Sequence, residues 1–384
     1  MNNFTVDLVT RLHFGQGQIS KLRKEITELG NNVLLVYGKN AIKNNGLYDE
    51  VQKELEGFHV VELSGVDPNP RLESVIEGQR LCKLHKIDVV LAVGGGSVID
   101  CSKAIAAASC YDGNPWDLVL NPKLINKVLP LVACLTNAAT GTEMNGASVI
   151  SNLETQEKLG FHSHLMKPTV SICDPKWSMS LSSYQTAAGS ADIMSHVFEN
   201  YFSTVTDSMV SDLLSIGILE TVMKYCPIAL DNPKDYAARA NLMWASTMGL
   251  NGLTGVGKGG GWSCHPIEHE LSAFYDITHG TGLAIITPHW MRHILSENTV
   301  ERFVLLGTKL FNLTGSDMEI AKETINRIEA FLRTLPIEKT LQECKIDHSL
   351  FDTMADRVLY HKDMTGAYVE LSHADIVSIL EKSL

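Results

Sequence analysis

The stretch over residues 88–109 constrains the fold more than any other part of the chain. An apolar run, DVVLAV, leads into Gly94, Gly95, Gly96 and Ser97, and the helix-like sequence SVIDCSKAIAAAS follows at once. A strand, a tight glycine turn and a helix in direct succession are typical of α/β sheets whose backbone N–H groups bind a phosphate. The run matches neither the Walker A pattern nor GxGxxG, and a tight turn that binds nothing is the alternative.

The rest of the first half repeats this alternation of strand and helix. Short apolar runs predict strands at residues 31–38, 59–65, 127–136 and 168–175, and helical spacing predicts helices over 47–57 and 71–86. Strands that alternate with helices predict a parallel α/β sheet that binds ligands at the carboxyl ends of its strands.

The second half has a different pattern. From Ser182 onward, apolar residues recur at helical spacing, as in residues 183–203, 209–226 and 234–253. A chain of 384 residues also exceeds the roughly 250–300 residues that one core supports. We therefore expect an α/β domain over residues 1–181, an all-helical domain over 182–384, and a ligand in the cleft between them.

Composition excludes several classes of partner. The net charge of −12 argues against nucleic acid and against anionic lipid, which both require a basic surface. We see no stretch near the roughly 20 apolar residues of a membrane helix, and no secretory signal at the start. The eight cysteines form no CxxC pair, which favours reduced thiols and a cytoplasmic protein.

Polar residues follow two of the predicted strands. Asp100 lies one turn into the helix after the glycines, where it either satisfies the helix dipole or contacts a cofactor. Thr136, Asn137 and Thr140 follow the strand that ends at Leu135, and either cap a helix or bind the cofactor. The sequence leaves both alternatives open.

A set of possible metal ligands lies in the second half. Asp192 and His196 are four residues apart in a predicted helix, as are His265 and His269, and His279 follows after a loop. A carboxylate with several imidazoles and no thiolate suits Fe(II) or Zn(II). A simple Asp–His hydrogen bond is the alternative for any one pair, and spacing alone does not say which residues ligate.

These segments together resemble the iron-containing alcohol dehydrogenases, in particular the branch of butanol dehydrogenases and NADPH-dependent aldehyde reductases. The similarity runs nearly end to end. It is carried by LSGVDPNPRLESV, LAVGGGSVIDCSKAIAA, LTNAATGTEMN, AAGSADIMSHVFENYF and CHPIEHELSAFYDITHG.

The resemblance implies a Rossmann-like N-terminal domain, a helical C-terminal domain and one divalent metal ion, Fe(II) or Zn(II). By motif position, the implied metal ligands are Asp192, His196, His265 and His279. His269 then falls near the metal without ligating it. Gly95, Gly96 and Ser97 fall on the pyrophosphate loop, and Asp100, Thr136, Thr140 and Lys158 line the cofactor site.

Cofactor choice depends on the residues after the first predicted strand. Members of this family that prefer NAD(H) often carry an acidic residue there, whereas this chain has Gly38, Lys39 and Asn40. Glycine leaves room for a 2′-phosphate, and the lysine can pair with it. We therefore expect NADP(H), with NAD(H) as the alternative.

The implied reaction moves a hydride between a nicotinamide and a small aldehyde or alcohol, such as butanal, with His269 as the proton relay. Four aromatic residues are candidates for an apolar substrate pocket or for the core: Trp244, Trp262, Phe274 and Tyr275. A dehydroquinate synthase-like lyase, a glycerol dehydrogenase and a non-catalytic nucleotide-binding protein are the other interpretations. The family also implies a homodimer. The sequence does not name the physiological substrate.

Overall fold

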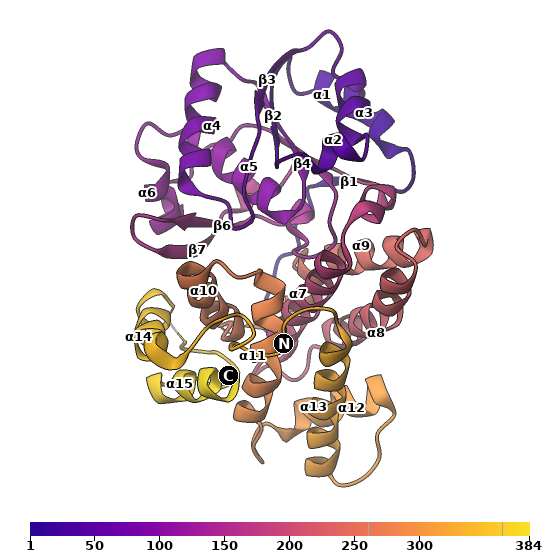
Figure 1. Ribbon diagram of the computed structural model, residues 1–384, viewed down its shortest axis with the longest axis vertical. Helices are drawn as coiled ribbons and strands as arrows, with labels where there is room; N and C mark the ends of the chain where they lie inside the picture. Colours follow the sequence, from indigo (N-terminus) through magenta and orange to yellow (C-terminus); the bar gives the residue numbers. More distant parts are fainter. Residues whose placement is uncertain (260, 363) are drawn as a thin grey trace. The chain divides into compact units, whose positions relative to one another are not determined.

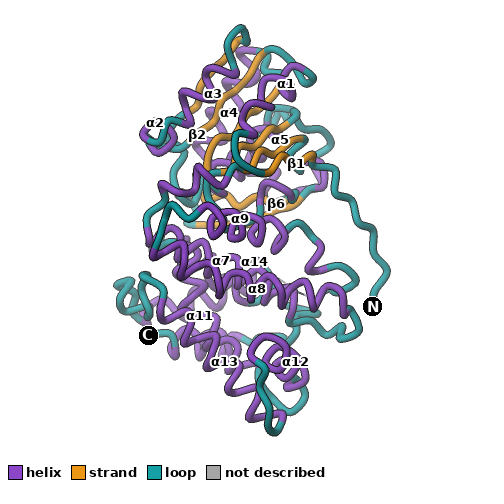
Figure 2. Tube along the Cα trace, turned by 90° about the vertical axis from the view of Figure 1, so that its right-hand side faces the viewer, coloured by secondary structure: helices purple, strands orange, loops and turns teal. Residues whose placement is uncertain are grey.

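The computed structural model describes residues 1–259, 261–362 and 364–384, which form two compact units. We call them the α/β unit, Asp7–Leu181 with Asn232–Thr247, and the helical unit, Met1–Val6 with Ser182–Asp231 and Met248–Leu384. The strands belong to the α/β unit, and the named elements of the helical unit are helices (Figure 2). The α/β class, with a parallel sheet in the first half of the chain and helices in the second, is confirmed.

A six-stranded parallel sheet in the order β1-β8-β5-β4-β2-β3 forms the centre of the α/β unit (Figure 1). Its strands are β1 (Arg11–Phe14), β2 (Asn32–Tyr37), β3 (His59–Leu63), β4 (Val89–Gly94), β5 (Leu131–Leu135) and β8 (Val170–Cys173). An antiparallel hairpin of β6 (Ala147–Asn152) and β7 (Glu157–His162) forms a second sheet, which the sequence analysis did not predict.

Successive residues of a strand point to opposite sides of the parallel sheet, and helices bury both of its faces. The helices that cover the two faces are α1 (Leu22–Thr27), α2 (Ala41–Asn44), α3 (Leu47–Glu54), α4 (Leu72–His85), α5 (Gly96–Ala108) and α6 (Pro115–Leu120). Leu34 and Val36 of β2 pack in one core with α4, α5 and α6, while Val33 and Leu35 pack in another with α1, α2 and α3. Because both faces are buried, the strands need continuous apolar runs rather than alternating apolar and polar residues.

The order of the strands reverses between β2 and β4. The chain passes from β2 to β3 on one side and then crosses to β4 on the other, so β2 and β4 are neighbours. Their register pairs Tyr37 with Val93, which places the residues after both strands at one edge of the sheet. In open α/β sheets, ligands bind at the carboxyl ends of strands where the order reverses.

The helical unit contains α7 (Ser183–Tyr201), α8 (Met209–Asp231), α10 (Cys264–Tyr275), α11 (His279–Ile294), α12 (Val300–Phe311), α13 (Asp317–Thr334), α14 (Phe351–His361) and α15 (His373–Lys382). Short 3-10 turns of the helical unit are Leu253–Gly255 and His348–Leu350, and those of the α/β unit are Gln18–Lys21, Pro122–Leu124, Thr142–Met144, His164–Met166 and Pro175–Ser180.

Close packing of α11 on α7 depends on a glycine. A Cβ atom at Gly280 would lie 2.0 Å from the carbonyl oxygen of Ala188, so any side chain there would push the two helices apart. At the start of α7, the side chain of Ser182 accepts a hydrogen bond from the backbone N–H of Gln185 at 3.1 Å and caps the helix. The glycine therefore permits the close approach of the two helices, and the cap marks where α7 begins.

Helix α8 is long and apolar enough to cross a membrane by length and composition, and 39% of its most apolar window is buried. The expectation that no stretch of the chain approaches a membrane helix did not include this window. Within the helical unit, Asp212 of α8 forms a bidentate ion pair with Arg302 of α12, with oxygen–nitrogen distances of 2.7 and 2.6 Å. Core helices of globular proteins meet the same length and hydropathy criteria, so the window by itself is weak evidence of a membrane span.

The chain changes unit between Val6 and Asp7 and again between Leu181 and Ser182, the second being the position expected from the sequence for the domain boundary. Helix α9 (Tyr236–Leu250) departs from the expected division, because residues 232–247 belong to the α/β unit. Ser246 accepts hydrogen bonds from the backbone N–H groups of Ala139 and Gly141 at 2.9 and 3.2 Å. Helical periodicity predicts the helix but does not say which unit it packs against. Met1–Val6 likewise belong to the helical unit.

Candidate active site

The glycine turn connects β4 to the N-terminus of α5. Gly95 is the N-cap residue of α5, and Gly95, Gly96 and Ser97 are all partly exposed. A Cβ atom at Gly96 would lie 2.7 Å from the hydroxyl oxygen of Thr140, and one at Gly95 would lie 3.3 Å from the Cβ of Asn137. The glycine turn and the segment 136–140, which were predicted separately to bind the cofactor, therefore lie side by side. The absence of side chains at Gly95 and Gly96 makes this close approach possible.

Three further observations fit a ligand at this edge. The side-chain oxygen of Asn137 is buried and has no hydrogen-bond partner among the described residues. Thr136 donates its backbone N–H to the carbonyl of Gly94 at 3.0 Å, which joins the ends of β4 and β5. After β2, a Cβ atom at Gly38 would lie 3.8 Å from Val98, so this residue also lies next to the glycine turn.

Lys39 and Asn40 follow Gly38 and are exposed. The ammonium group of Lys39 forms an ion pair with Asp67 at 2.8 Å, in the loop after β3. Asp67 therefore competes with any 2′-phosphate for the charge of Lys39. Asp67 lies in the segment GVDPNP and was not among the residues expected at the cofactor site.

Asp100 and Lys103 of α5 belong to a buried group that we call the Lys103 network. Lys103 donates to the hydroxyl of Thr142 at 2.6 Å, to the side-chain oxygen of Asn145 at 3.0 Å and to the carbonyl of Ala147 at 2.7 Å. Asp100 accepts from the hydroxyl of Thr142 at 2.5 Å. Burial lowers the pKa of Lys103 to about 8, although the charge of Asp100 opposes the change.

The carboxylate of Asp100 thus has partners within the α/β unit. The second carboxylate oxygen accepts a hydrogen bond from the backbone N–H of Val149 at 3.0 Å. The backbone carbonyl of Asp100 accepts a hydrogen bond from the hydroxyl of Ser148 at 2.9 Å. These bonds attach the hairpin of β6 and β7 to α5. Lys158 is buried on the same hairpin, paired with Ser151 of β6. The contacts support a positioning role for Asp100 within the predicted cofactor site.

The predicted metal ligands meet within the helical unit, and we call Asp192, His196, His265 and His279 the histidine cluster. The nitrogen Nδ1 of His196 and the nitrogen Nε2 of His279 lie 3.4 and 3.7 Å from the same carboxylate oxygen of Asp192. The ring centroid of His265 is 4.6 Å from that of His196 and 5.3 Å from that of His279. One potential ligand atom each from Asp192, His265 and His279 lies within 4.8 Å of the others.

Two nitrogen atoms of the cluster have no hydrogen-bond partner among the described residues. They are Nδ1 of His196 and Nε2 of His265, and both are buried. Burial, with smaller contributions from the neighbouring His265 and His279, holds the pKa of His196 well below its ordinary value. Neutral imidazoles with unused lone pairs beside a carboxylate are the form in which histidine binds a divalent cation. The donor set therefore fits Fe(II) or Zn(II).

Two buried carboxylates behind the cluster were not predicted. Glu199 of α7 lies 3.2 Å from Nδ1 of His265, and Glu268 of α10 contacts Nδ1 of His279. A signal for both exists in the sequence, because Glu199 is three residues after His196 and Glu268 is three residues after His265. Residues three apart share a helix face.

His269 lies at the margin of the cluster. Its ring centroid is 5.5 Å from that of His279 and 6.4 Å from that of His265, and its side chain is partly exposed. A second group of potential ligand atoms joins His269 with Glu268 and His279. The position suits either a proton relay or an additional ligand.

The aromatic candidates have different surroundings. The ring of Trp262 packs 4.7 Å from His265 and 5.7 Å from His196, measured between centroids, so it covers the cluster. Trp244 packs on Phe14 in the α/β unit, and Phe274 lies under the guanidinium group of Arg357. Of these residues, Trp262 is the one in contact with the cluster. Tyr275 is the last residue of α10.

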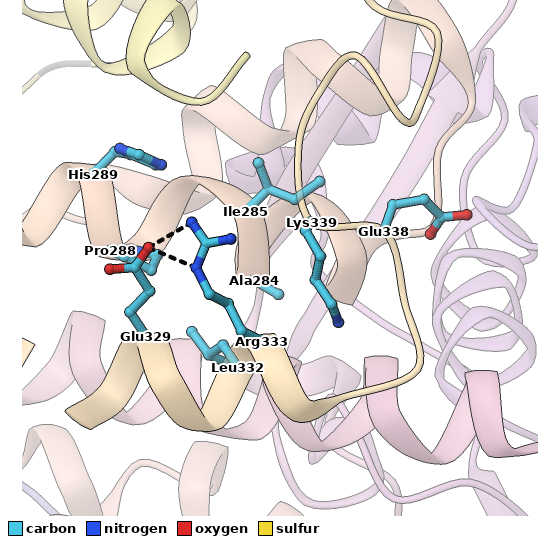
Figure 3. A pocket seen from close by; sticks show the side chains of 9 residues that line it. All are labelled: Ala284, Ile285, Pro288, His289, Glu329, Leu332, Arg333, Glu338 and Lys339. Atoms are coloured by element: carbon cyan, nitrogen blue, oxygen red, sulfur yellow. Dashed lines mark hydrogen bonds and ion pairs between the residues drawn. The ribbon is translucent and has the colours of Figure 1, made fainter. Parts of the chain in front are cut away.

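A separate hollow lies between α11 and α13, and Figure 3 shows the side chains that line it. Its volume is about 20 Å³, which is room for roughly one water molecule. The guanidinium group of Arg333 is bound to Glu329 at 2.9 and 2.8 Å, and Lys339 donates to the carbonyl of Leu335. This hollow is too small for a substrate, and its cations already have partners.

Comparison with known proteins assigns the family. The iron-containing alcohol dehydrogenase model matches residues 9–175, and the C-terminal model of the same family matches residues 186–384. The chain belongs to the iron-containing alcohol dehydrogenase family. It is an oxidoreductase of the NAD(P)-dependent alcohol dehydrogenase and aldehyde reductase type.

Relatives match this alcohol dehydrogenase over all or nearly all of its length. It is 45% identical to NADH-dependent butanol dehydrogenase A of Clostridium acetobutylicum, with 100% of both chains covered. It is 35% identical to the NADPH-dependent aldehyde reductase YqhD of Escherichia coli, with 94% of each covered. The crystal structure of NADH-dependent butanol dehydrogenase A from Thermotoga maritima superposes with a TM-score of 0.95 at 39% identity, covering 100% of this chain and 99% of that one. These relatives favour the alcohol dehydrogenase over the lyase interpretation.

Proposed function

We propose that this enzyme reduces short aliphatic aldehydes such as butanal, and that the histidine cluster holds one divalent metal ion, Fe(II) or Zn(II). The observation that carries the proposal is a pair of buried ring nitrogens, on His196 and His265, that have no hydrogen-bond partner in the described part of the chain and lie beside the carboxylate of Asp192. A buried polar group left unbonded costs about 1–3 kcal/mol, which a bound cation would offset.

In the proposed reaction, some residues of the chain bind the coenzyme and the metal ion, and another transfers a proton. When bound, the cation polarises the carbonyl oxygen of the aldehyde and the reduced nicotinamide supplies the hydride. Backbone N–H groups of Gly95, Gly96 and Ser97 bind the pyrophosphate of the coenzyme at the N-terminus of α5. Trp262 covers the rings of His196 and His265 and keeps water from them.

His269 completes the proposed reaction. Its partly exposed ring lies beside His279, so a ring nitrogen can take a proton from solvent and pass it to the substrate oxygen. This role predicts that His269→Ala lowers turnover and changes the pH profile while the metal content stays the same. An unchanged profile at full turnover would assign His269 no part in proton transfer.

The deciding experiment is a coenzyme-oxidation assay. Protein stripped with a chelator and resupplied with Fe(II) or Zn(II) is mixed with butanal and either NADPH or NADH, and the loss of absorbance at 340 nm is followed. We expect turnover that depends on the returned metal. Turnover that persists in fully stripped protein, or none with either metal across a series of aldehydes, would contradict the proposal.

The preference for NADP(H) over NAD(H) depends on Lys39. Gly38 leaves room, because the atom nearest to a Cβ there would be the carbonyl oxygen of Val66 at 3.5 Å. The ion pair with Asp67 opposes the preference, and the relatives at 43–45% identity are named as NADH-dependent. We expect Asp67→Asn to raise the NADPH-to-NADH ratio of kcat/KM about two- to fivefold, as for an exposed ion pair. If Asp67→Asn and Lys39→Ala both left the NADPH-to-NADH ratio of kcat/KM unchanged, other residues would determine the coenzyme preference.

The proposed enzyme works in the cytoplasm as a homodimer. All eight cysteines are free thiols, which suits a reducing compartment. Strand β1 stands at one end of the strand order, where a second copy of the chain can add a strand. Light scattering on the purified protein tests the dimer, and a monomeric mass at micromolar concentration would exclude it.

A further inference from the structure

We propose that Glu199 and Glu268 are positioning residues that fix which ring nitrogen of His265 and His279 faces the metal ion. The proposal deepens the proposed function and rests on the metal site described there. It concerns two carboxylates that lie behind the histidine cluster and that none of the predicted roles includes.

Glu199 is held rigidly against His265. One carboxylate oxygen accepts the backbone N–H of His265 at 2.8 Å and lies 3.2 Å from its ring nitrogen Nδ1. The other oxygen accepts the backbone N–H of Ser263 at 3.0 Å. Because the two backbone donors fix the carboxylate, the ring of His265 places its proton on Nδ1 and leaves the lone pair on Nε2. That Nε2 atom is buried and has no hydrogen-bond partner in residues 1–259, 261–362 and 364–384.

Glu268 holds His279 in the same way. One of its oxygens contacts Nδ1 of His279, and the other accepts the hydroxyl of Ser272. Gly282 makes room for the carboxylate, since a Cβ atom there would lie 2.8 Å from Cγ of Glu268. With Nδ1 engaged, Nε2 of His279 points toward the carboxylate of Asp192, 3.7 Å away.

Both histidines therefore present the same atom, Nε2, to one space, and each does so because a carboxylate occupies Nδ1. A carboxylate behind a ligating imidazole fixes the tautomer and the ring orientation and makes the free lone pair more basic. Loss of such a partner typically weakens metal binding about 10- to 100-fold. Helix geometry places both carboxylates: Glu199 shares a face of α7 with Asp192 and His196, and Glu268 shares a face of α10 with His265.

The test compares Glu199→Gln and Glu268→Gln with Glu270→Gln. Glu270 is a matched control, because it is buried on the same helix as Glu268 but pairs with Arg357 of α14 at 2.8 Å. The dissociation constant for Zn(II) is measured by competition with a chromophoric chelator, and the visible spectrum of the Co(II)-loaded protein reports the ligand geometry. Melting temperatures of the metal-free proteins show whether each variant is folded.

We expect both Gln variants near the histidines to bind Zn(II) about 10- to 100-fold more weakly and to change the Co(II) spectrum. Glu270→Gln should keep the wild-type affinity and spectrum even if it melts earlier. Ser272→Ala is the milder variant for the case that Glu268→Gln does not fold. It removes the hydroxyl bound to Glu268 and should weaken Zn(II) binding by less than Glu268→Gln.

Wild-type affinity in Glu199→Gln and Glu268→Gln, or equal weakening in Glu270→Gln, would overturn this proposal. Wild-type affinity in Ser272→Ala would do the same if Glu268→Gln does not fold. A failure of the proposed function gives a different result: the wild-type protein itself would bind no stoichiometric metal, and His265→Ala would change nothing.

Discussion

Lys103 in the α/β unit and His265 in the helical unit are both buried polar residues on helices, but their surroundings differ. The ammonium group of Lys103 has three acceptors at 2.6, 3.0 and 2.7 Å, all from the α/β unit itself. His265 has one ring nitrogen beside Glu199, while its other nitrogen is buried without a partner among the described residues.

This difference separates a structural site from a binding site. A buried network whose members all have partners holds its segments in one arrangement. A buried cluster that keeps atoms unbonded is costly unless a ligand binds there. The Lys103 network therefore explains how α5 and the hairpin of β6 and β7 are held together. The histidine cluster explains where a cation would bind.

The largest effect should come from removing a member of the histidine cluster. We expect His265→Ala to lose its metal and to lower kcat on the order of a thousandfold or more, since a Lewis acid supplies several kcal/mol of transition-state stabilisation. Metal content by elemental analysis and turnover at 340 nm check this. His289→Ala on α11 is the control, and a comparable loss there would mean that the unit is merely disturbed.

Removing Lys103 should act on stability. We expect Lys103→Met to lower the free energy of unfolding by about 3 kcal/mol, because it leaves buried polar partners uncompensated. In the folded wild-type chain the pKa of Lys103 is about 8, below the ordinary value of 10.5, so the unfolded chain binds this proton more tightly. Wild-type stability relative to the variant should therefore rise between pH 8 and pH 10.5.

Urea unfolding at a series of pH values measures both quantities. Lys123→Met is the control, because Lys123 is exposed in the same unit and should change stability by less than about 0.5 kcal/mol. If the two lysine variants unfolded alike at every pH, the Lys103 network would have no special role in stability.

The smallest effect should come from the coenzyme loop. A methyl group at Gly96 would meet Thr140 at 2.7 Å, so Gly96→Ala should displace the loop and raise the KM for the coenzyme about tenfold, equivalent to roughly 1.4 kcal/mol. Its metal content should stay unchanged. Thr140→Ala in the same chain removes the two nearest of these atoms, the hydroxyl oxygen and the methyl carbon, and the double variant should recover part of the loss.

Gly217→Ala provides the control for the loop. A Cβ atom at Gly217 of α8 would have no atom of the described residues within 4 Å, so alanine there should be neutral or stabilise by about 0.5–1 kcal/mol. If Gly96→Ala kept the wild-type KM for the coenzyme, the glycine turn would not be part of the coenzyme site. These results together would show how far the two units can be changed independently.

Local pattern predicted much of this molecule. The apolar runs and the glycines gave β4 and α5, because a strand and a helix differ in the period of their apolar residues. The spacing of Asp192 and His196, and of His265 and His269, put each pair on one helix face for the same reason. The hairpin of β6 and β7 was missed, because its strands carry polar residues at buried positions, so apolar and polar residues do not alternate cleanly; these residues are Ser148, Ser151, Asn152 and Lys158.

By itself, the sequence determined which donor atoms the chain carries and how they are spaced within each helix, since helix geometry fixes distances over a few residues. Only the tertiary structure decided that α9 belongs with the sheet, that Asp67 faces Lys39, and that Glu199 and Glu268 lie behind two histidines. These are contacts between distant segments, and they depend on packing. The close approach of α11 to Ala188, which Gly280 permits, is the clearest case.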